Sequence, residues 1–143
     1  MNVAYVVVDT DVSSRIFRDR LSGPLAAKLV GKTLCTTFVT LAELTQWAEM
    51  RHWGSRNRLA LERWLAPILV LPYNENQDDG VLEDVARVWG EISARARLRG
   101  RARPHNDTWI AACCLVYDLP LATLNVKDFA DFAEHEGLTL VSG

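Results

Sequence analysis

The chain has 143 residues, of which 49% are hydrophobic and 24% are charged, and its formal net charge is −2. This length suits one domain with a buried core, and the composition excludes a disordered or fibrous chain. The small negative charge gives no overall field that attracts a polyanion, so any nucleic-acid binding must come from a local basic patch.

Strand and helix patterns alternate along the whole chain. Apolar, often β-branched runs predict strands at residues 3–8, 34–39, 68–71, 121–124 and 138–141. Helical spacing and end signals predict helices that begin near residue 12 and then at residues 25–30, 40–53, 56–65, 78–99, 104–116 and 128–136. This alternation predicts an α/β fold, a three-layer α/β/α sandwich around a mainly parallel, roughly five-stranded sheet, in one domain over residues 1–143.

The sequence also predicts a cytoplasmic protein that does not cross a membrane. It has no run of 18 or more apolar residues, and residues 1–4 lack the basic start of an export signal. The three cysteines, Cys35, Cys113 and Cys114, are odd in number and have no metal-finger spacing. Reduced, buried thiols are therefore expected.

Acidic residues follow the predicted strands or begin the predicted helices. Asp9 directly follows the first strand, Glu43 follows the second, Asp107 comes soon after Pro104, and Asp128 follows the fourth strand. Because the carboxyl ends of parallel strands meet at one edge of a sheet, these acids can converge there.

Each acid also has a purely structural interpretation. Asp9 could cap the following helix, and Glu43 could close a capping box that begins at Thr40. Asp107 would be favoured by the helix dipole in a first turn, and residues 125–128 could form a local cap or turn. For any single acid the sequence leaves both interpretations open.

Taken together, the four acids predict a cation site. Carboxylates about 4 Å apart repel each other by roughly 1–4 kcal/mol per pair, and Lys127 is the only internal counter-ion nearby in the sequence. Mg²⁺ and Mn²⁺ prefer oxygen ligands and keep bound waters. Such an ion supplies a nucleophile and stabilises charge on a phosphoryl group, so the acids favour metal-assisted hydrolysis of phosphodiester bonds.

Four segments carry a family resemblance. They are the apolar strand that ends in Asp9-Thr10-Asp11-Val12, then Val39-Thr40-Leu41-Ala42-Glu43-Leu44, Asn106-Asp107-x-x-Ile110-Ala111-Ala112, and Thr123-Leu124-Asn125-Val126-Lys127-Asp128-Phe129. In this order they resemble the PIN-domain ribonucleases, and within them the VapC-type toxins of bacterial toxin–antitoxin pairs. The four segments span most of the chain.

The resemblance implies an endoribonuclease that depends on Mg²⁺ or Mn²⁺. Its acidic quartet falls on Asp9, Glu43, Asp107 and Asp128, with Asp9 and Asp107 as the principal metal ligands. It further implies an RNA substrate, a homodimer and a cognate antitoxin whose C-terminal segment covers the site, and no organic cofactor is expected. Asp11 stands where the family often has Asn, and its role as a ligand, a support or a helix cap stays open.

Other residues near these segments have two interpretations each. Arginines alternate along residues 95–103 and could either offset a helix dipole or bind phosphate; we expect Arg101 and Arg103 to contact RNA because the run leads to Asp107. Asn125 could orient a carboxylate or the RNA, or only form a turn. Thr10 could bond to a metal-bound water or to the backbone. The five tryptophans are expected mainly in the core.

Two alternative functions compete with the nuclease. Asp9-Thr10-Asp11 after a buried strand also looks like the start of a haloacid-dehalogenase-like phosphatase, with Asp9 as the covalent nucleophile. In that family Lys127-Asp128 is only a partial match, and Asp107 has no role. The other alternative is a non-catalytic PIN-like module that binds RNA or a protein, although such a module has little reason to keep carboxylates that repel each other.

Overall fold

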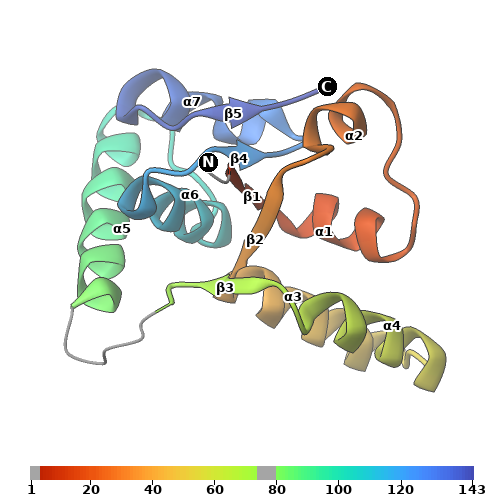
Figure 1. The fold of residues 1–143 in the computed structure, drawn as a ribbon. Helices are drawn as coiled ribbons and strands as arrows, with labels where there is room; N and C mark the ends of the chain where they lie inside the picture. Colours follow the sequence, from red (N-terminus) through yellow and green to blue (C-terminus); the bar gives the residue numbers. More distant parts are fainter. Residues whose placement is uncertain (1–3, 74–79) are drawn as a thin grey trace.

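The computed structural model describes residues 4–73 and 80–143, and a parallel five-stranded sheet lies at its centre (Figure 1). The strands are β1 (Tyr5–Val8), β2 (Thr33–Thr37), β3 (Leu69–Leu71), β4 (Leu121–Ala122) and β5 (Leu140–Val141). Their spatial order is β3-β2-β1-β4-β5, which places β1 in the middle. The predicted α/β fold with a parallel sheet is confirmed.

Strand β1 is covered on both faces, as its unbroken valine run predicts. Val6 and Val8 pack in a cluster with Leu25 and Leu29, which belong to the helix after Gly23. Val7 points to the opposite face, into a cluster formed largely by the helices of the C-terminal half. The central strand therefore anchors both outer layers and fixes the position of Asp9 at its end.

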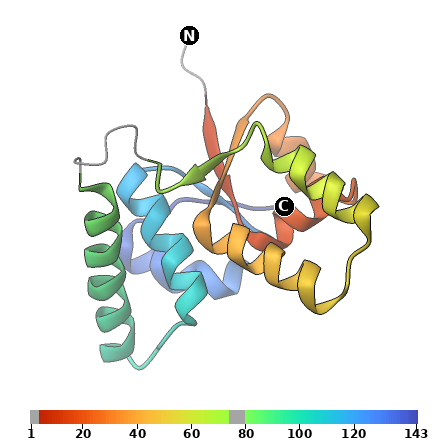
Figure 2. The same ribbon diagram turned by 90° about the horizontal axis from the view of Figure 1, so that it is seen from below.

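The helices form those two layers. They are α1 (Thr10–Phe17), α2 (Gly23–Leu29), α3 (Phe38–Met50), α4 (Ser55–Leu65), α5 (Val81–Leu98), α6 (His105–Tyr117) and α7 (Val126–Glu136). Helices α5, α6 and α7 pack on the sheet face of Val7, and α1 and α2 pack on the other face. Figure 2 shows α5 and α4 on opposite sides of the molecule.

A third apolar cluster joins α3 and α4 to the end of α1. It contains Leu44, Ala48, Trp53 and Leu61, with Phe17 packed against it. No helix in the described part of the chain is both long enough and apolar enough to cross a lipid bilayer.

Several predicted boundaries are wrong by a few residues, and local capping explains two of the shifts. The second strand ends at Thr37 and not at residue 39, because the Thr37 side chain accepts a hydrogen bond from the Thr40 N–H and starts α3 at Phe38. The first helix begins at Thr10 and not near residue 12, because the Asp9 side chain caps it.

The remaining shifts lie at element ends. Helix α1 stops at Phe17, before the Gly23-Pro24 pair, and α2 already includes Gly23 as its first residue. Helix α3 ends at Met50 rather than at residue 53. Helix α5 is predicted to begin at residue 78, which lies outside the described residues together with residue 3 of the first predicted strand. Strands β4 and β5 cover only two residues each.

Candidate active site

The parallel topology brings the four predicted acids to one edge of the sheet. Asp9 caps α1 directly after β1, and Asp128 lies in the first turn of α7, after β4. Asp107 lies in the first turn of α6, whose far end leads into β4, so its beginning returns to the same edge. Glu43 lies in the second turn of α3, because that helix starts two residues earlier than predicted.

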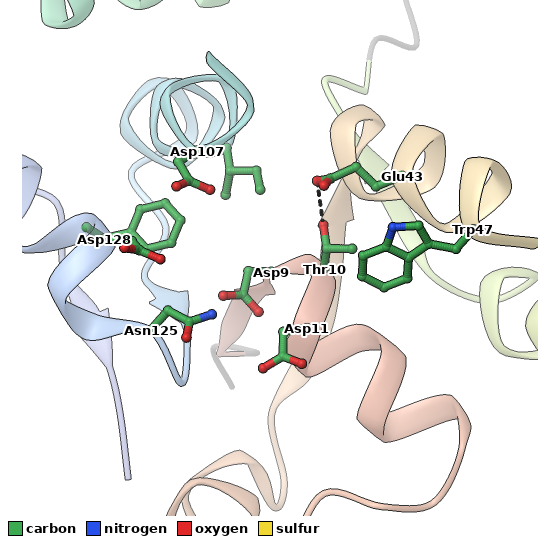
Figure 3. Close-up of a pocket in the computed structure, with 10 residues that line it drawn as sticks. Asp9, Thr10, Asp11, Glu43, Trp47, Asp107, Asn125 and Asp128 are labelled. Carbon is green, nitrogen blue, oxygen red and sulfur yellow. Dashed lines mark hydrogen bonds between the residues drawn. The ribbon is translucent and has the colours of Figure 1, made fainter. Parts of the chain in front are cut away.

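These acids line one pocket with a volume of about 180 Å³ (Figure 3). Its lining residues are Asp9, Thr10, Asp11, Glu43, Trp47, Asp107, Ile110, Asn125, Asp128 and Phe129. Figure 3 shows Asp107 and Asp128 on one side of the pocket, Glu43 and Trp47 on the other, and Asp9 between them. The four acids therefore converge on one pocket, as the sequence predicts.

Asp9 is both the cap of α1 and a pocket residue, so its capping role does not exclude a role in the pocket. Its side chain is 4% exposed, and Oδ1 accepts a hydrogen bond of 2.9 Å from the Val12 N–H. Burial raises the pKa of Asp9 to about 6, against the lowering effect of hydrogen bonds from Thr123 and Val12. The negative charges of Asp11 and Glu43 raise the pKa further.

Asp107 is under the influence of all three other acids. Burial is the largest cause that raises its pKa to about 6, and the charges of Asp128, Glu43 and Asp9 act in the same direction. Arg103 lowers the pKa of Asp107, which makes Arg103 a nearby cation. Four carboxylates drawn from separate segments therefore share one electrostatic environment.

The beginnings of three helices face the pocket, and they offset part of this negative charge. Asp9 caps α1, Asp107 lies in the first turn of α6, and Asp128 lies in the first turn of α7. Helix N-termini carry partial positive charge and favour nearby carboxylates. The raised pKa of Asp107 indicates that this offset leaves substantial negative charge at the pocket.

Glu43 is held by threonine hydroxyls and not by the predicted capping box. The Thr10 hydroxyl donates a hydrogen bond of 2.9 Å to Oε1 of Glu43, and the same hydroxyl lies 3.0 Å from that of Thr40. The carboxylate is thus tied to the first residue of α1, and Thr37 caps α3 in place of Thr40. Neither of the two interpretations of Thr10 included its hydrogen bond to Glu43.

The structure places residues in or beside the pocket that the sequence did not identify. Trp47, Ile110 and Phe129 provide apolar walls, and Thr123 bonds to Asp9 from the end of β4. Thr123 also accepts a hydrogen bond of 2.9 Å from the Asn125 N–H. The only signal for Thr123 was its place inside the last matching segment, just before Asn125.

The arginines of residues 95–103 divide into two groups. Arg95 pairs with Glu136 at 2.8 Å, and Arg99 donates to both carboxylate oxygens of the buried Asp131, so these two tie α5 to α7. Both residues lie at the end of α5, so their ion pairs do not exclude the helix-dipole interpretation. Arg103 lies near enough to lower the pKa of Asp107, whereas Lys127, the expected counter-ion, is exposed and does not line the pocket.

The donor atoms in the pocket suit a hard divalent cation. Carboxylate oxygens are the preferred ligands of Mg²⁺ and Mn²⁺, and Mg²⁺ is commonly held by one or two carboxylates with waters in its other positions. No group of three histidine, cysteine, aspartate or glutamate side chains within residues 4–73 and 80–143 stands ready to enclose an ion.

A family model for the PIN domain matches residues 6–135, which is most of the chain. The chain belongs to the PIN domain family. This match confirms the predicted resemblance, and the segments that contain Asp9, Glu43, Asp107 and Asp128 all lie within it. The phosphatase alternative left Asp107 without a role, whereas Asp107 lies in the pocket of this PIN domain.

The chain is similar to known proteins over two thirds or more of its length. The ribonuclease VapC2 of Haemophilus influenzae is 28% identical over 96 residues, which cover 67% of either chain. A chain of the VapBC-5 toxin–antitoxin structure from Mycobacterium tuberculosis is 26% identical, with a TM-score of 0.70 and coverage of 98% and 99%. A chain of the DNA-bound VapBC structure from Salmonella typhimurium has a TM-score of 0.78 at 20% identity and covers 98% of both chains.

Proposed function

We propose that this PIN domain is an endoribonuclease that depends on Mg²⁺ or Mn²⁺ and hydrolyses phosphodiester bonds in RNA. One observation carries the proposal: carboxylates from four separate segments line one pocket, where burial and then the charges of the other three raise the pKa of Asp107. A fold keeps such repulsion where a cation offsets it. The nuclease is proposed to be one domain, since all four acids lie within the family match.

Asp9 and Asp107 are the proposed principal ligands, with Glu43 and Asp128 completing the site directly or through water. A bound divalent ion would supply an activated water and stabilise charge on the phosphodiester. Thr10 orients Glu43, and the hydrogen bond from the Val12 N–H orients Asp9. The raised pKa values of Asp9 and Asp107 fit groups whose charge an ion would later offset.

We further propose that the protein is the toxin of a VapBC-type pair. The similarity to a curated VapC ribonuclease and to chains from VapBC structures supports this proposal. The expected partners are then a cognate antitoxin that covers the pocket and a second copy of the chain. Light scattering during size-exclusion chromatography, with the chain alone and with the product of a neighbouring small gene, tests both partners.

Arg101, Arg103 and Asn125 are proposed to contact the RNA. The influence of Arg103 on Asp107 and the place of Asn125 in the pocket wall support two of these assignments. Charge reversal at Arg101 and Arg103 is expected to weaken RNA binding and to reduce its salt dependence. Unchanged affinity and unchanged salt dependence would remove these arginines from the proposal.

The proposed activity is tested by incubating the purified chain with RNA in Mg²⁺, in Mn²⁺ and in EDTA. Internal cleavage in either metal and none in EDTA supports the nuclease. Release of inorganic phosphate with a trapped phospho-aspartate at Asp9 would instead support the phosphatase. A chain that binds RNA but cleaves none under any of these conditions would support the non-catalytic module.

A further inference from the structure

The acid pocket continues into a second hollow along α1 and α3. This hollow has a volume of about 380 Å³ and shares Asp11 and Trp47 with the acid pocket. Figure 3 shows that Asp11 and Trp47 come from α1 and α3, the side of the pocket away from Asp107 and Asp128. The two hollows are therefore adjacent, and a strand that leaves the acids along this path would enter the second hollow.

The path is lined by arginine. The second hollow is lined by Arg18, Arg20 and Arg51, which also line a third hollow of about 550 Å³, where Arg56 is added. We call these four residues the arginine groove. All four are exposed, and they come from the end of α1, the end of α3 and the start of α4.

The positive charge of the arginine groove is not offset by the acids nearby. Asp11 pairs with Arg15 at 3.3 Å, and Glu49 pairs with Arg58 at 3.1 Å. Asp19 lines a different, mostly apolar hollow. No arginine of the groove forms an ion pair with a carboxylate in the described part of the chain, so the groove is a local cationic patch on a chain of net charge −2.

Aromatic rings hold two of these guanidinium groups in place without neutralising them. The Cζ of Arg18 lies 4.9 Å from the ring centroid of Trp53 and 5.6 Å from that of Phe17. The Cζ of Arg51 lies 5.3 Å from the ring centroid of Trp47. A guanidinium packed on a ring keeps its N–H donors free for an anion, and the planar fork matches phosphate oxygens.

We propose that the arginine groove binds the phosphate backbone of the RNA strand that continues from the cleaved bond. The proposal rests on the nuclease function proposed above and adds a substrate-binding track to it. The acid pocket repels a small free anion. An RNA strand held at the pocket by a metal ion would instead extend its phosphates along the groove arginines. Trp47 is half-buried and lines both the acid pocket and the second hollow. Its ring can stack with an unstacked RNA base, and an acidic peptide has no base to place there.

The track is tested with a fluorescent single-stranded RNA and the Asp9→Asn chain, which keeps a capping side chain at position 9. The double variant Arg20→Gln with Arg56→Gln removes two charges from the groove. Neither side chain has an ion pair or hydrogen bond in the described part of the chain, so the variant is expected to fold. The control, Arg87→Gln with Arg97→Gln, removes two charges from exposed positions on α5, where Arg87 pairs with the exposed Asp84 at 3.3 Å. Anisotropy titrations at several salt concentrations give the affinity and its salt slope.

The groove variant is expected to bind RNA about tenfold more weakly at moderate salt, with a salt slope reduced by about 1.4 for two lost phosphate contacts. The control is expected to match the Asp9→Asn parent. Equal affinity and slope for both double variants would overturn the track. So would weaker binding of a polyglutamate peptide together with unchanged RNA binding, which would assign the groove to a protein partner.

These titrations read binding alone and stay separate from the test of the nuclease. Cleavage by the chain with Asp9 intact tests the proposed activity, and the groove arginines are not part of the metal site. If that chain cleaves RNA and the groove variant binds RNA normally, the track is wrong and the activity stands. If the chain never cleaves RNA but the groove variant loses affinity, the proposed function fails and the RNA track remains.

Discussion

The Thr10 hydroxyl donates a hydrogen bond to Oε1 of Glu43 over 2.9 Å, and this bond joins the first residue of α1 to the second turn of α3. Thr10 is buried, and its hydroxyl also lies 3.0 Å from that of Thr40. The carboxylate of Glu43 is therefore oriented before any ligand arrives, and the orientation depends on contact between two helices.

Replacement of Thr10 with Val is expected to release Glu43 while it keeps the shape of the side chain. We expect RNA cleavage to fall by about 10- to 100-fold, the usual effect of removing a group that orients a ligand, and stability to fall by about 1 kcal/mol. Thr10→Ser keeps the hydroxyl and serves as the control. Initial cleavage rates and urea unfolding measure the two effects; equal rates for the Val and Ser variants would contradict the role given to this bond.

The charge of Asp107 is expected to make the metal-free protein less stable as the pH rises. Its folded-state pKa of about 6 lies above the ordinary 3.8, so the folded chain binds more protons between these values. Stability contributed by this group therefore falls as the pH rises from about 4 to about 6 and is level above that.

Asp107→Asn removes this charge and is expected to stabilise the protein in EDTA at pH 7.5. The gain should be on the order of 1 kcal/mol, less than the full value of the pKa shift because the side chain is partly exposed, and should be smaller at pH 5. Urea unfolding at the two pH values measures it. If the variant were less stable than the parent by the same amount at both pH values, the charge of Asp107 would not destabilise the folded protein.

A divalent ion is expected to reverse that effect in the parent. Ligands that bind only the folded state stabilise it by about 2.7 kcal/mol at 100 times their Kd, so saturating MnCl₂ should raise the Tm by about 5 °C. Asp107→Asn should reduce the rise. Asp118→Asn is the control, because Asp118 lies exposed at the other end of α6, where its φ of 52° suits Asn. Equal rises in all three chains would place the ion elsewhere.

Arg99 is expected to stabilise the fold by its ion pair with Asp131. Asp131 is 4% exposed, and Arg99 lowers its pKa through a hydrogen bond, so stability from this pair is present above the ordinary pKa and lost at lower pH. Arg99→Gln removes the main partner of this carboxylate and should lower the free energy of unfolding at pH 7.

Arg97→Gln on the same helix is the matched control, because its side chain is exposed. It should change stability by less than about 0.5 kcal/mol. Urea unfolding of the two variants at pH 7 makes the comparison. Equal stability for both would mean that the link between α5 and α7 contributes nothing measurable.

The sequence predicted the sheet and the convergence of the four acids because both depend on where the strands end. The valine run of β1 is apolar on both faces, which only a covered strand needs, and Asp9 follows it directly. Because parallel strands end at the same edge of the sheet, the acids after the other strands were expected beside Asp9. The start of α3 was missed because Phe38 and Val39 continue a strand-like pattern, and only the cap at Thr37 decides that they are helical.

Contacts between distant segments were beyond the sequence pattern. Nothing local distinguishes Arg99 from Arg97, yet Arg99 meets Asp131, 32 residues away, and Arg97 remains exposed. The same holds for Thr10 and Glu43, which are 33 residues apart. Trp47 was expected in the core, and its place in the pocket wall depends on how α3 lies against α1.

The most direct test of the acidic site is the rate of RNA cleavage in Mg²⁺ by the parent, Asp9→Asn, Asp107→Asn and the control Asp118→Asn. We predict that the parent and the control cleave at the same rate. The two pocket variants should be slower by at least about 100-fold, a loss of the size that follows removal of one charge-stabilising group. Cleavage at the parental rate by Asp9→Asn and Asp107→Asn, each shown to be folded, would contradict the proposed site.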